Sequence, residues 1–353
     1  MRKILVLRGG ALGDFIVTLP ALALLRRRWP AARIELVGNA TAAQLVLTPH
    51  RHASRPPEVC HPLDDKPNPS SPRDANPLCH PLDDNTCVRP PPSRQSQSHP
   101  TGGDAPEKIG LIDFVHSQHE ARWLALYGTE ILPPELTQWL SEFDLVLSYW
   151  PDPEGELARR FPLRDGQRFL SASAIPTQAP AAAHYCSPLL AIGLSTTGYF
   201  FPLQPSGSLA GNRIAIHPGS GSAKKNWPRE RWDALAGWLR EKFSAELLII
   251  AGEAEAGVVP SFIRRGRVVF NRPPRELAAE LARCRLFLGH DSGVSHLAAA
   301  CGAPCVLLFG PTDPAMWAPP SPCVHVLRRG TELNSISLAD VQRAVTSVLA
   351  ARA

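Results

Sequence analysis

Long hydrophobic runs are missing from this sequence of 353 residues. No stretch reaches the roughly 18 consecutive apolar residues that a membrane-spanning helix requires. The N-terminal run I-L-V-L ends at Arg8, whereas a secretory signal needs an apolar core of about 7–15 residues. We therefore expect a buried first strand in place of a signal peptide, and a cytoplasmic protein.

Clustered cysteines and a large excess of charge are also missing. The formal net charge is +5, which falls short of the dense Lys/Arg surface of a nucleic-acid-binding protein. This mild excess still permits an anionic substrate or a lipid surface. The eight cysteines are spread through a long chain, so we expect reduced thiols and no disulfide framework.

Aromatic residues are absent between Pro49 and Pro106, a stretch that holds 14 of the 37 prolines. Residues 49–108 therefore read as a low-complexity, disordered insertion, because they cannot bury enough apolar surface to offset the entropy of ordering. The hexapeptide C-H-P-L-D-D occurs twice, at Cys60–Asp65 and Cys79–Asp84. The spacing is not that of a zinc site, so a duplicated linker is the favoured interpretation over metal binding.

The rest of the chain alternates short apolar runs with helical stretches, which predicts an α/β fold of two doubly wound, Rossmann-like domains. We place an N-terminal domain at residues 1–190 and a C-terminal domain at 191–353, facing across a cleft. For the last helix two positions stay open: within the C-terminal domain, or packed back on the N-terminal domain. Strands are expected at Lys3–Arg8, Arg33–Val37, Ile109–Val115, Phe143–Ser148, Arg213–His217, Glu246–Ala251, Arg267–Phe270, Arg285–Gly289 and Pro304–Phe309.

Ligands bind beyond the carboxyl ends of the strands in such sheets, so the loops there carry the candidate sites. The first of these loops is G-A-L-G-D, which differs from the dinucleotide pattern G-x-G-x-x-G. Gly10 and Gly13 let the backbone approach a phosphate. Asp14 is either a catalytic carboxylate or a simple cap of the following helix.

A second loop, H-P-G-S-G-S-A-K-K-N-W-P, follows a strand and precedes a helix. Ser220 and Ser222 offer hydroxyl donors, and Lys224 and Lys225 offer positive charge, a combination that suits a diphosphate. The alternative is a solvated basic turn.

The third loop, G-H-D-S-G-V-S-H, is the most informative. It brings Asp291, Ser292 and Gly293 to a helix N-terminus, where free N–H groups and the helix dipole favour an anion. His296 lies one turn into that helix. The alternatives are a buried core histidine at 296 and a simple capping role for Asp291.

Two further loops follow strands in the C-terminal half. Gly252–Glu255 supplies a carboxylate for ribose hydroxyls or begins a surface helix, and Leu308–Pro319 suits the lining of a nucleotide or sugar pocket. No Walker loop, H-E-x-x-H motif, zinc ribbon or carboxylate cluster for Mg²⁺ is found. Helix N-termini and a lysine are able to neutralise a diphosphate without a metal ion, so neither a metal nor a cofactor is expected.

These motifs resemble glycosyltransferase family 9, the ADP-heptose:lipopolysaccharide heptosyltransferases. The resemblance is carried by R-G-G-A-L-G-D-F-I-V-T-L-P-A-L, by H-P-G-S-G-S-A-K-K-N-W-P, and by D-S-G-V-S-H-L-A-A-A-C-G-A-P with L-F-G-P-T-D-P. It implies a GT-B fold and an inverting, metal-independent transfer from an ADP-sugar to a lipopolysaccharide-core acceptor. It also implies that the C-terminal domain binds the donor and the N-terminal domain the acceptor.

The resemblance implies a role for each matching residue. Asp14 corresponds to the general base, Lys225 to a contact with the donor phosphates, and Glu255 to a contact with the nucleotide. The donor diphosphate and sugar are assigned to Asp291, Ser292, Gly293 and His296. The chain departs from many members at Gly9 and Gly10, where they carry Ser or Thr, and in the long insertion on the acceptor side.

Two other functions remain open from the sequence. A nucleotide-sugar epimerase or hydrolase of the same fold needs no acceptor, and a non-catalytic sugar-nucleotide-binding protein needs no base. The basic run Arg26–Arg28 with Trp29 is either a contact with anionic lipid at the inner membrane or a solvated helix end.

Overall fold

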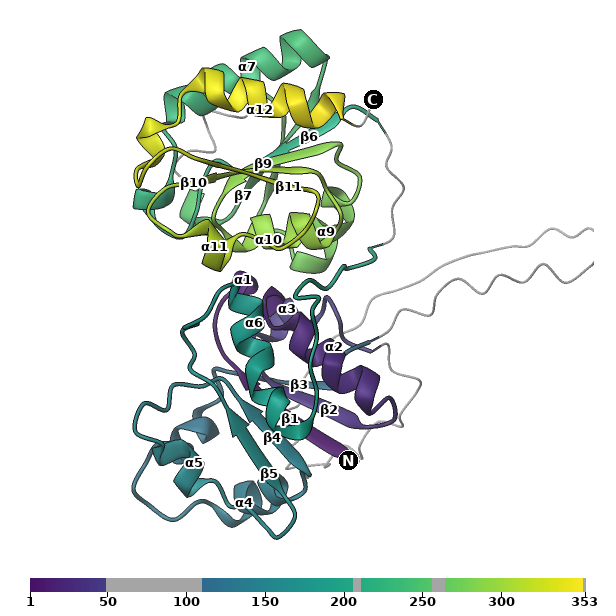
Figure 1. Cartoon of the computed structure of the whole chain (residues 1–353), viewed down its shortest axis with the longest axis vertical. Coiled ribbons are helices and arrows are strands. Elements are labelled where there is room, and N and C mark those ends of the chain that lie inside the picture. The colour runs from purple at the N-terminus through teal and green to yellow at the C-terminus, as the bar shows by residue number, and fades with distance from the viewer. Residues whose placement is uncertain (49–109, 206–210, 256–263, 352–353) are drawn as a thin grey trace, which may run out of the picture. The chain divides into compact units, whose positions relative to one another are not determined.

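The computed structural model describes residues 1–48, 110–205, 211–255 and 264–351. The predicted insertion at 49–108, with its repeated hexapeptide, lies entirely outside the described residues. Two parallel sheets organise the described chain (Figure 1).

The first sheet has the strand order β3-β2-β1-β4-β5, and all four pairings are parallel. Its centre is β1, because the apolar run after Lys3 is buried on both faces. The strands are β1 (Lys3–Arg8), β2 (Arg33–Gly38), β3 (Phe114–Ser117), β4 (Leu145–Ser148) and β5 (Arg168–Ser171).

Helices cover both faces of this sheet (Figure 1). One face packs on α1 (Leu12–Ile16), α2 (Leu19–Arg28), α3 (Ala40–Ala43) and α6 (Ala181–Cys186), which runs on into the 3-10 turn η2 (Ser187–Ile192). The other face packs on the 3-10 helix η1 (Ala121–Leu126), α4 (Pro134–Ser141) and α5 (Glu156–Arg160).

The second sheet has the order β11-β10-β9-β6-β7-β8 and is also parallel throughout. Its strands are β6 (Arg213–Ile216), β7 (Glu246–Ala251), β8 (Arg267–Phe270), β9 (Leu286–His290), β10 (Cys305–Phe309) and β11 (Val324–Arg328). One face carries α7 (Arg229–Phe243) and α12 (Leu338–Ala350), and the other carries α9 (Pro274–Leu281), α10 (Gly293–Ala300) and α11 (Pro314–Trp317) (Figure 1). Short 3-10 turns are η3 (Ala223–Lys225), η4 (Glu253–Glu255) and η5 (Leu333–Ser335).

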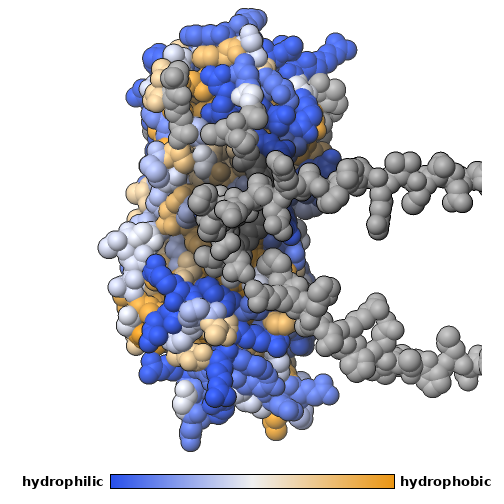
Figure 2. Space-filling model, turned by 90° about the vertical axis from the view of Figure 1, so that its right-hand side faces the viewer, coloured by the Kyte–Doolittle hydropathy of each residue, from blue (hydrophilic) through white to orange (hydrophobic). Residues whose placement is uncertain are grey.

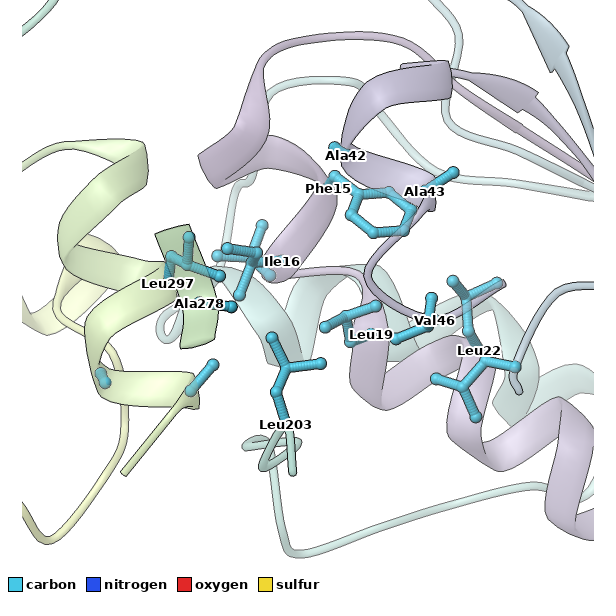
Figure 3. Packing of buried hydrophobic residues seen from close by; sticks show 14 of the residues in the cluster. Phe15, Ile16, Leu19, Leu22, Ala42, Ala43, Val46, Leu203, Ala278 and Leu297 are labelled. Atoms are coloured by element: carbon cyan, nitrogen blue, oxygen red, sulfur yellow. The ribbon is translucent and has the colours of Figure 1, made fainter. Parts of the chain in front are cut away.

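Apolar packing joins elements of the two sheets into one cluster. Ile16 of α1 lies beside Leu297 of α10 and Ala278 of α9, with Leu203 close to them (Figure 3). All four side chains are buried. The end of α1 is therefore held against the helices of the second sheet by burial of apolar surface.

The GT-B-type α/β fold is confirmed, with differences in individual elements. The expected strand at Ile109–Val115 is shifted to β3, because Leu111 and Ile112 hydrogen-bond to Val46 instead. The edge strands β5 and β11 were missed, because they are only partly buried and lack a strong apolar pattern. The last helix, α12, packs on α7 and the second sheet and not on the N-terminal half.

None of the described helices is long and apolar enough to cross a bilayer. Polar residues cover much of the surface seen in Figure 2, with apolar residues scattered among them. Within the basic run at the end of α2, Arg26 is a structural residue: it bonds the carbonyl of Ala32 at 2.7 Å and Asp113 Oδ2 at 2.6 Å. Only Arg27 and Arg28 of that run are exposed.

Candidate active site

The loop after β1 is held by a residue that follows the neighbouring strand β2 and by one that follows β3, the strand beyond it. The Gly10 N–H donates to Gln118 Oε1 at 3.0 Å, and Asn39 Nδ2 donates to the Gly10 carbonyl at 3.2 Å. Gly10 has φ of +111°, and a Cβ there would lie 2.6 Å from Asp14 Oδ2. Any side chain at position 10 would therefore be strained in this conformation, which explains the glycine there.

Asp14 lies in the first turn of α1, with both carboxylate oxygens engaged. Oδ2 accepts a hydrogen bond from Ala11 N at 2.9 Å, and Oδ1 accepts one from Arg8 Nη2 at 3.2 Å. The side chain is 37% exposed. The predicted capping role is therefore present, and the carboxylate still reaches solvent.

Arg8 is a buried cation beneath this carboxylate. Its side chain is 4% exposed, and Nη2 also donates to the Tyr185 hydroxyl at 3.1 Å. The guanidinium lies 4.5 Å from the centroid of the Tyr185 ring, and burial raises the pKa of that phenol. Arg8 is held on two sides, so it fixes the position of Asp14 from below.

In the C-terminal half, His217 and Glu255 follow β6 and β7. Glu255 Oε2 accepts a hydrogen bond from Gly252 N at 2.8 Å and lies 3.9 Å from His217 Nε2. The neighbouring imidazole and this N–H hold the pKa of Glu255 below its usual value. A Cβ on Gly219 would lie 2.1 Å from Glu255 Cγ, so glycine at 219 makes room for the carboxylate.

Lys225 and Asp291 form an ion pair at the mouth of the site. The Nζ–Oδ2 distance is 2.7 Å, and the side chains are 32% and 10% exposed. Ser220 Oγ lies 2.8 Å from both Asn226 Oδ1 and the Ser222 carbonyl, so it closes the turn that carries Lys225. Through its backbone, Ser222 supports the same turn.

His290, at the end of β9, ties both ends of the Lys225 turn together. Its Nε2 accepts a hydrogen bond from Trp227 N at 2.9 Å, and its Nδ1 lies 3.2 Å from the Gly219 carbonyl. Burial lowers the pKa of His290 to about 3, so the ring is neutral and able to accept one bond and donate one. These two contacts fix the Lys225 turn to the second sheet, through β9.

Helix α10 begins beside the first loop. Ser292 caps it by accepting from Ser295 N at 3.4 Å, and a Cβ on Gly293 would lie 2.8 Å from Gly13 N. His296 is buried, and burial lowers its pKa, while the charges of Asp291 and Asp14 act in the opposite direction. The N-termini of α1 and α10 therefore meet at two glycines.

A cleft of about 280 Å³ opens between these loops. Its polar lining includes His217, Ser220, Glu255 and Ser292, and Ala11 and Leu12 close it from the first loop. Its apolar lining includes Ile250, Val269, Pro274 and Leu277, and Asn271 and Arg272 also line it.

The structure thus places most of the predicted residues around one cleft. Ser220, Glu255, Ser292 and Gly293 line it directly. Lys225, Asp291, His296, Gly13 and Asp14 surround it through the contacts given above, and Ser222 supports the turn without lining it. Sequence reasoning missed Arg8 and His290; for Arg8 the available signal was a charge that ends a fully apolar strand.

Comparison with known proteins agrees with the motifs. Residues 201–344 match the family model for glycosyltransferase family 9 (heptosyltransferase), which confirms the resemblance in the C-terminal half. Lipopolysaccharide heptosyltransferase 3 of Escherichia coli is 28% identical over 120 residues, 31% of this chain and 34% of that protein. The chain therefore matches about a third of the length of this curated relative.

Solved structures show the same fold. A family 9 glycosyl transferase from Veillonella parvula has a TM-score of 0.67 at 18% identity and covers 99% of this chain and 97% of its own. E. coli heptosyltransferase WaaC with ADP has a TM-score of 0.62 at 17% identity, covering 98% of this chain and 99% of its own. Identities this low establish the fold alone.

Proposed function

We propose, from the match of residues 201–344 to glycosyltransferase family 9, that this chain is an inverting glycosyltransferase. It transfers a heptose, or a related sugar, from an ADP-sugar to a lipopolysaccharide-core acceptor. The observation that carries the proposal is the position of Asp14, whose α1 N-terminus meets that of α10 at Gly13 and Gly293. A carboxylate and an anion-binding helix start thus lie at one cleft.

The side chains and helix N-terminus at the carboxyl edge of the second sheet match the chemical groups of an ADP-sugar donor. The apolar lining of the cleft, which includes Ile250, Val269 and Leu277, suits a purine base. Glu255 is ionised and suits the ribose hydroxyls. The diphosphate then lies at the free N–H groups of α10, with Lys225 as its cation.

In the transfer step, Asp14 takes the proton of the acceptor hydroxyl while that oxygen attacks the anomeric carbon. The bond from this carbon to the phosphate oxygen breaks, and ADP leaves with the electron pair, so the configuration inverts. A positioned base contributes about 10²–10⁴-fold in rate. Stabilisation of the leaving diphosphate by Lys225 and α10 is the second contribution, and it requires no metal ion.

Arg8 supports the base in this mechanism. Its contacts with Asp14 and Tyr185 hold the carboxylate in place before substrate binds. A base that is already oriented avoids the loss of rate that a displacement of about 1 Å causes.

The test combines purified protein with ADP-heptose and lipopolysaccharide from an E. coli strain that lacks lipopolysaccharide heptosyltransferase 3. We expect release of ADP and a gain of one heptose mass on the acceptor, both resistant to a metal chelator and both lost in Asp14→Asn. Epimerised or free heptose at full rate without acceptor would support the epimerase or hydrolase instead. A thermal-shift series over ADP-, GDP- and UDP-sugars identifies the donor.

The proposed acceptor is a lipid-linked saccharide, so the enzyme would work at the cytoplasmic face of the inner membrane. Arg27 and Arg28, exposed at the end of α2, are the candidate contacts with anionic headgroups. Co-sedimentation with vesicles of anionic lipid, with and without Arg27→Ala and Arg28→Ala, tests this contact.

A further inference from the structure

Next to the Asp14 loop lies a second set of polar and aromatic groups, on the side of the first sheet. Gln118 follows β3 and Trp150 follows β4, so both lie at the carboxyl edge of the first sheet, where β4 is next to β1 and β3 lies beyond β2. A Cβ on Gly9 would lie 3.5 Å from Gln118 Oε1 and 3.7 Å from Trp150 Nε1. The missing side chain of Gly9 thus leaves a notch between an amide and an indole N–H.

The indole N–H of Trp150 lacks a partner. The side chain is 8% exposed, and no acceptor for Nε1 lies within hydrogen-bonding distance among the described residues. Buried Trp N–H groups usually find a partner, so one that does not calls for an explanation. Trp232 Nε1 is also unpaired, but that atom is fully shielded from solvent. Trp150 Nε1 is not among the fully shielded unpaired atoms of the described residues. A ligand can reach it.

An aromatic surface continues from this notch. The Tyr127 ring lies 27° from the plane of Trp150, with centroids 6.2 Å apart, and its side chain is 46% exposed. Burial, with the charge of Asp152 as a second cause, raises the pKa of Tyr127 to about 12, so the phenol is neutral. The negative charge of Asp152 disfavours an anionic group at this place and favours a neutral one.

We infer that the notch over Gly9, lined by Gln118, Trp150 and Tyr127, binds a neutral, hydroxyl-rich sugar ring of the acceptor. The indole N–H donates to a sugar hydroxyl, and the exposed Tyr127 ring packs against the apolar face of the sugar. Such a site combines aromatic lining with a few fixed polar groups, as ligand sites generally do.

The location ties this site to Asp14. Gln118 accepts the Gly10 N–H at 3.0 Å, and a Cβ on Gly10 would lie 2.6 Å from Asp14 Oδ2. A single loop residue, Gly10, therefore separates a sugar bound in the notch from the proposed base. The inference rests on the proposed function for the identity of the ligand as acceptor, but the binding itself is measurable without turnover.

The sharpest variant is Gly9→Ala. Its Cβ meets its neighbours at ordinary van der Waals distances, and Gly9 does not have a positive φ, so the fold tolerates it while the notch is filled. Trp150→Phe keeps a ring and removes the N–H. Trp139→Phe is the matched control, because Trp139 lies in the same aromatic cluster but not at Gly9.

The probe is deacylated lipopolysaccharide from the E. coli strain without heptosyltransferase 3, titrated calorimetrically into each protein. We expect Trp150→Phe to weaken binding by about 2–10-fold, the effect of one lost hydrogen bond. Gly9→Ala should weaken it at least as much, with ADP affinity unchanged and Trp139→Phe like the wild type. Binding of the saccharide by both variants as tightly as by the wild type, or no binding by the wild type, overturns the inference.

Transfer assays on the same proteins separate the two proposals. Binding that is weakened by Gly9→Ala in a protein that transfers no sugar would refute the proposed enzymatic function and leave the sugar site standing. Normal transfer with an unchanged acceptor KM in both variants would refute the sugar site and leave the proposed enzymatic function standing.

Discussion

Arg8 Nη2 lies 3.2 Å from Asp14 Oδ1, so a contact joins the last residue of β1 to the first turn of α1 across the loop between them. One is almost fully buried and the other is 37% exposed. The pair therefore connects the interior of the first sheet to the cleft, and removing the buried partner acts directly on the proposed base.

Arg8→Met should lower kcat by about 10²-fold, because Asp14 loses the group that holds it in position. The proposed donor site lies on the second sheet, so the affinity for ADP should stay unchanged. Arg8→Lys keeps the charge and should recover part of kcat. Steady-state kinetics with an ADP titration measures both effects, and a fall in ADP affinity that matches the fall in kcat would assign Arg8 a general structural role instead.

Lys225→Ala should raise the Kd for ADP by about 10–100-fold, the effect expected for a lost charge-assisted hydrogen bond to phosphate. The same change also leaves the Asp291 carboxylate without its partner, which repels the diphosphate. Lys224→Ala is the control, since Lys224 is exposed in the same turn. Equal losses in the two variants would point to general electrostatic attraction and not to a specific contact.

Gly293→Ala should destabilise the protein by about 1–3 kcal/mol, because its Cβ would lie 2.8 Å from Gly13 N and two backbones must separate. Gly221→Ala has no neighbour within 4 Å of the added Cβ and should leave the melting temperature unchanged. Thermal unfolding of both variants measures this. Unchanged melting in Gly293→Ala would mean that α1 and α10 do not touch in solution.

Stability should fall as the pH drops from about 6.5 toward 3, with His290 contributing to the loss. The pKa of His290 is about 3 in the folded chain and near 6.5 when unfolded, so between these values the unfolded state binds the extra proton. His290→Gln keeps a donor and an acceptor but does not titrate. Its unfolding free energy should therefore depend less on pH over this range, as denaturant titrations at pH 7.5 and 5 will show.

The sequence by itself determined which chemical groups the loops carry and where the buried strands lie. Apolar runs such as Lys3–Arg8 predict buried parallel strands, and such strands place their following loops at one edge. The glycines, Asp14, Lys225 and Asp291 could therefore be named beforehand. The weak edge strands β5 and β11 could not, because half-buried strands carry little apolar pattern.

Only the tertiary structure decided which groups meet. Arg8 reads as a polar end to a strand until Tyr185, 177 residues away, is seen to hold it beside Asp14. His290 and the turn at Gly219–Trp227 are also joined across the chain. Such contacts depend on long-range packing, which local propensity and spacing do not encode, so they come only from the folded chain.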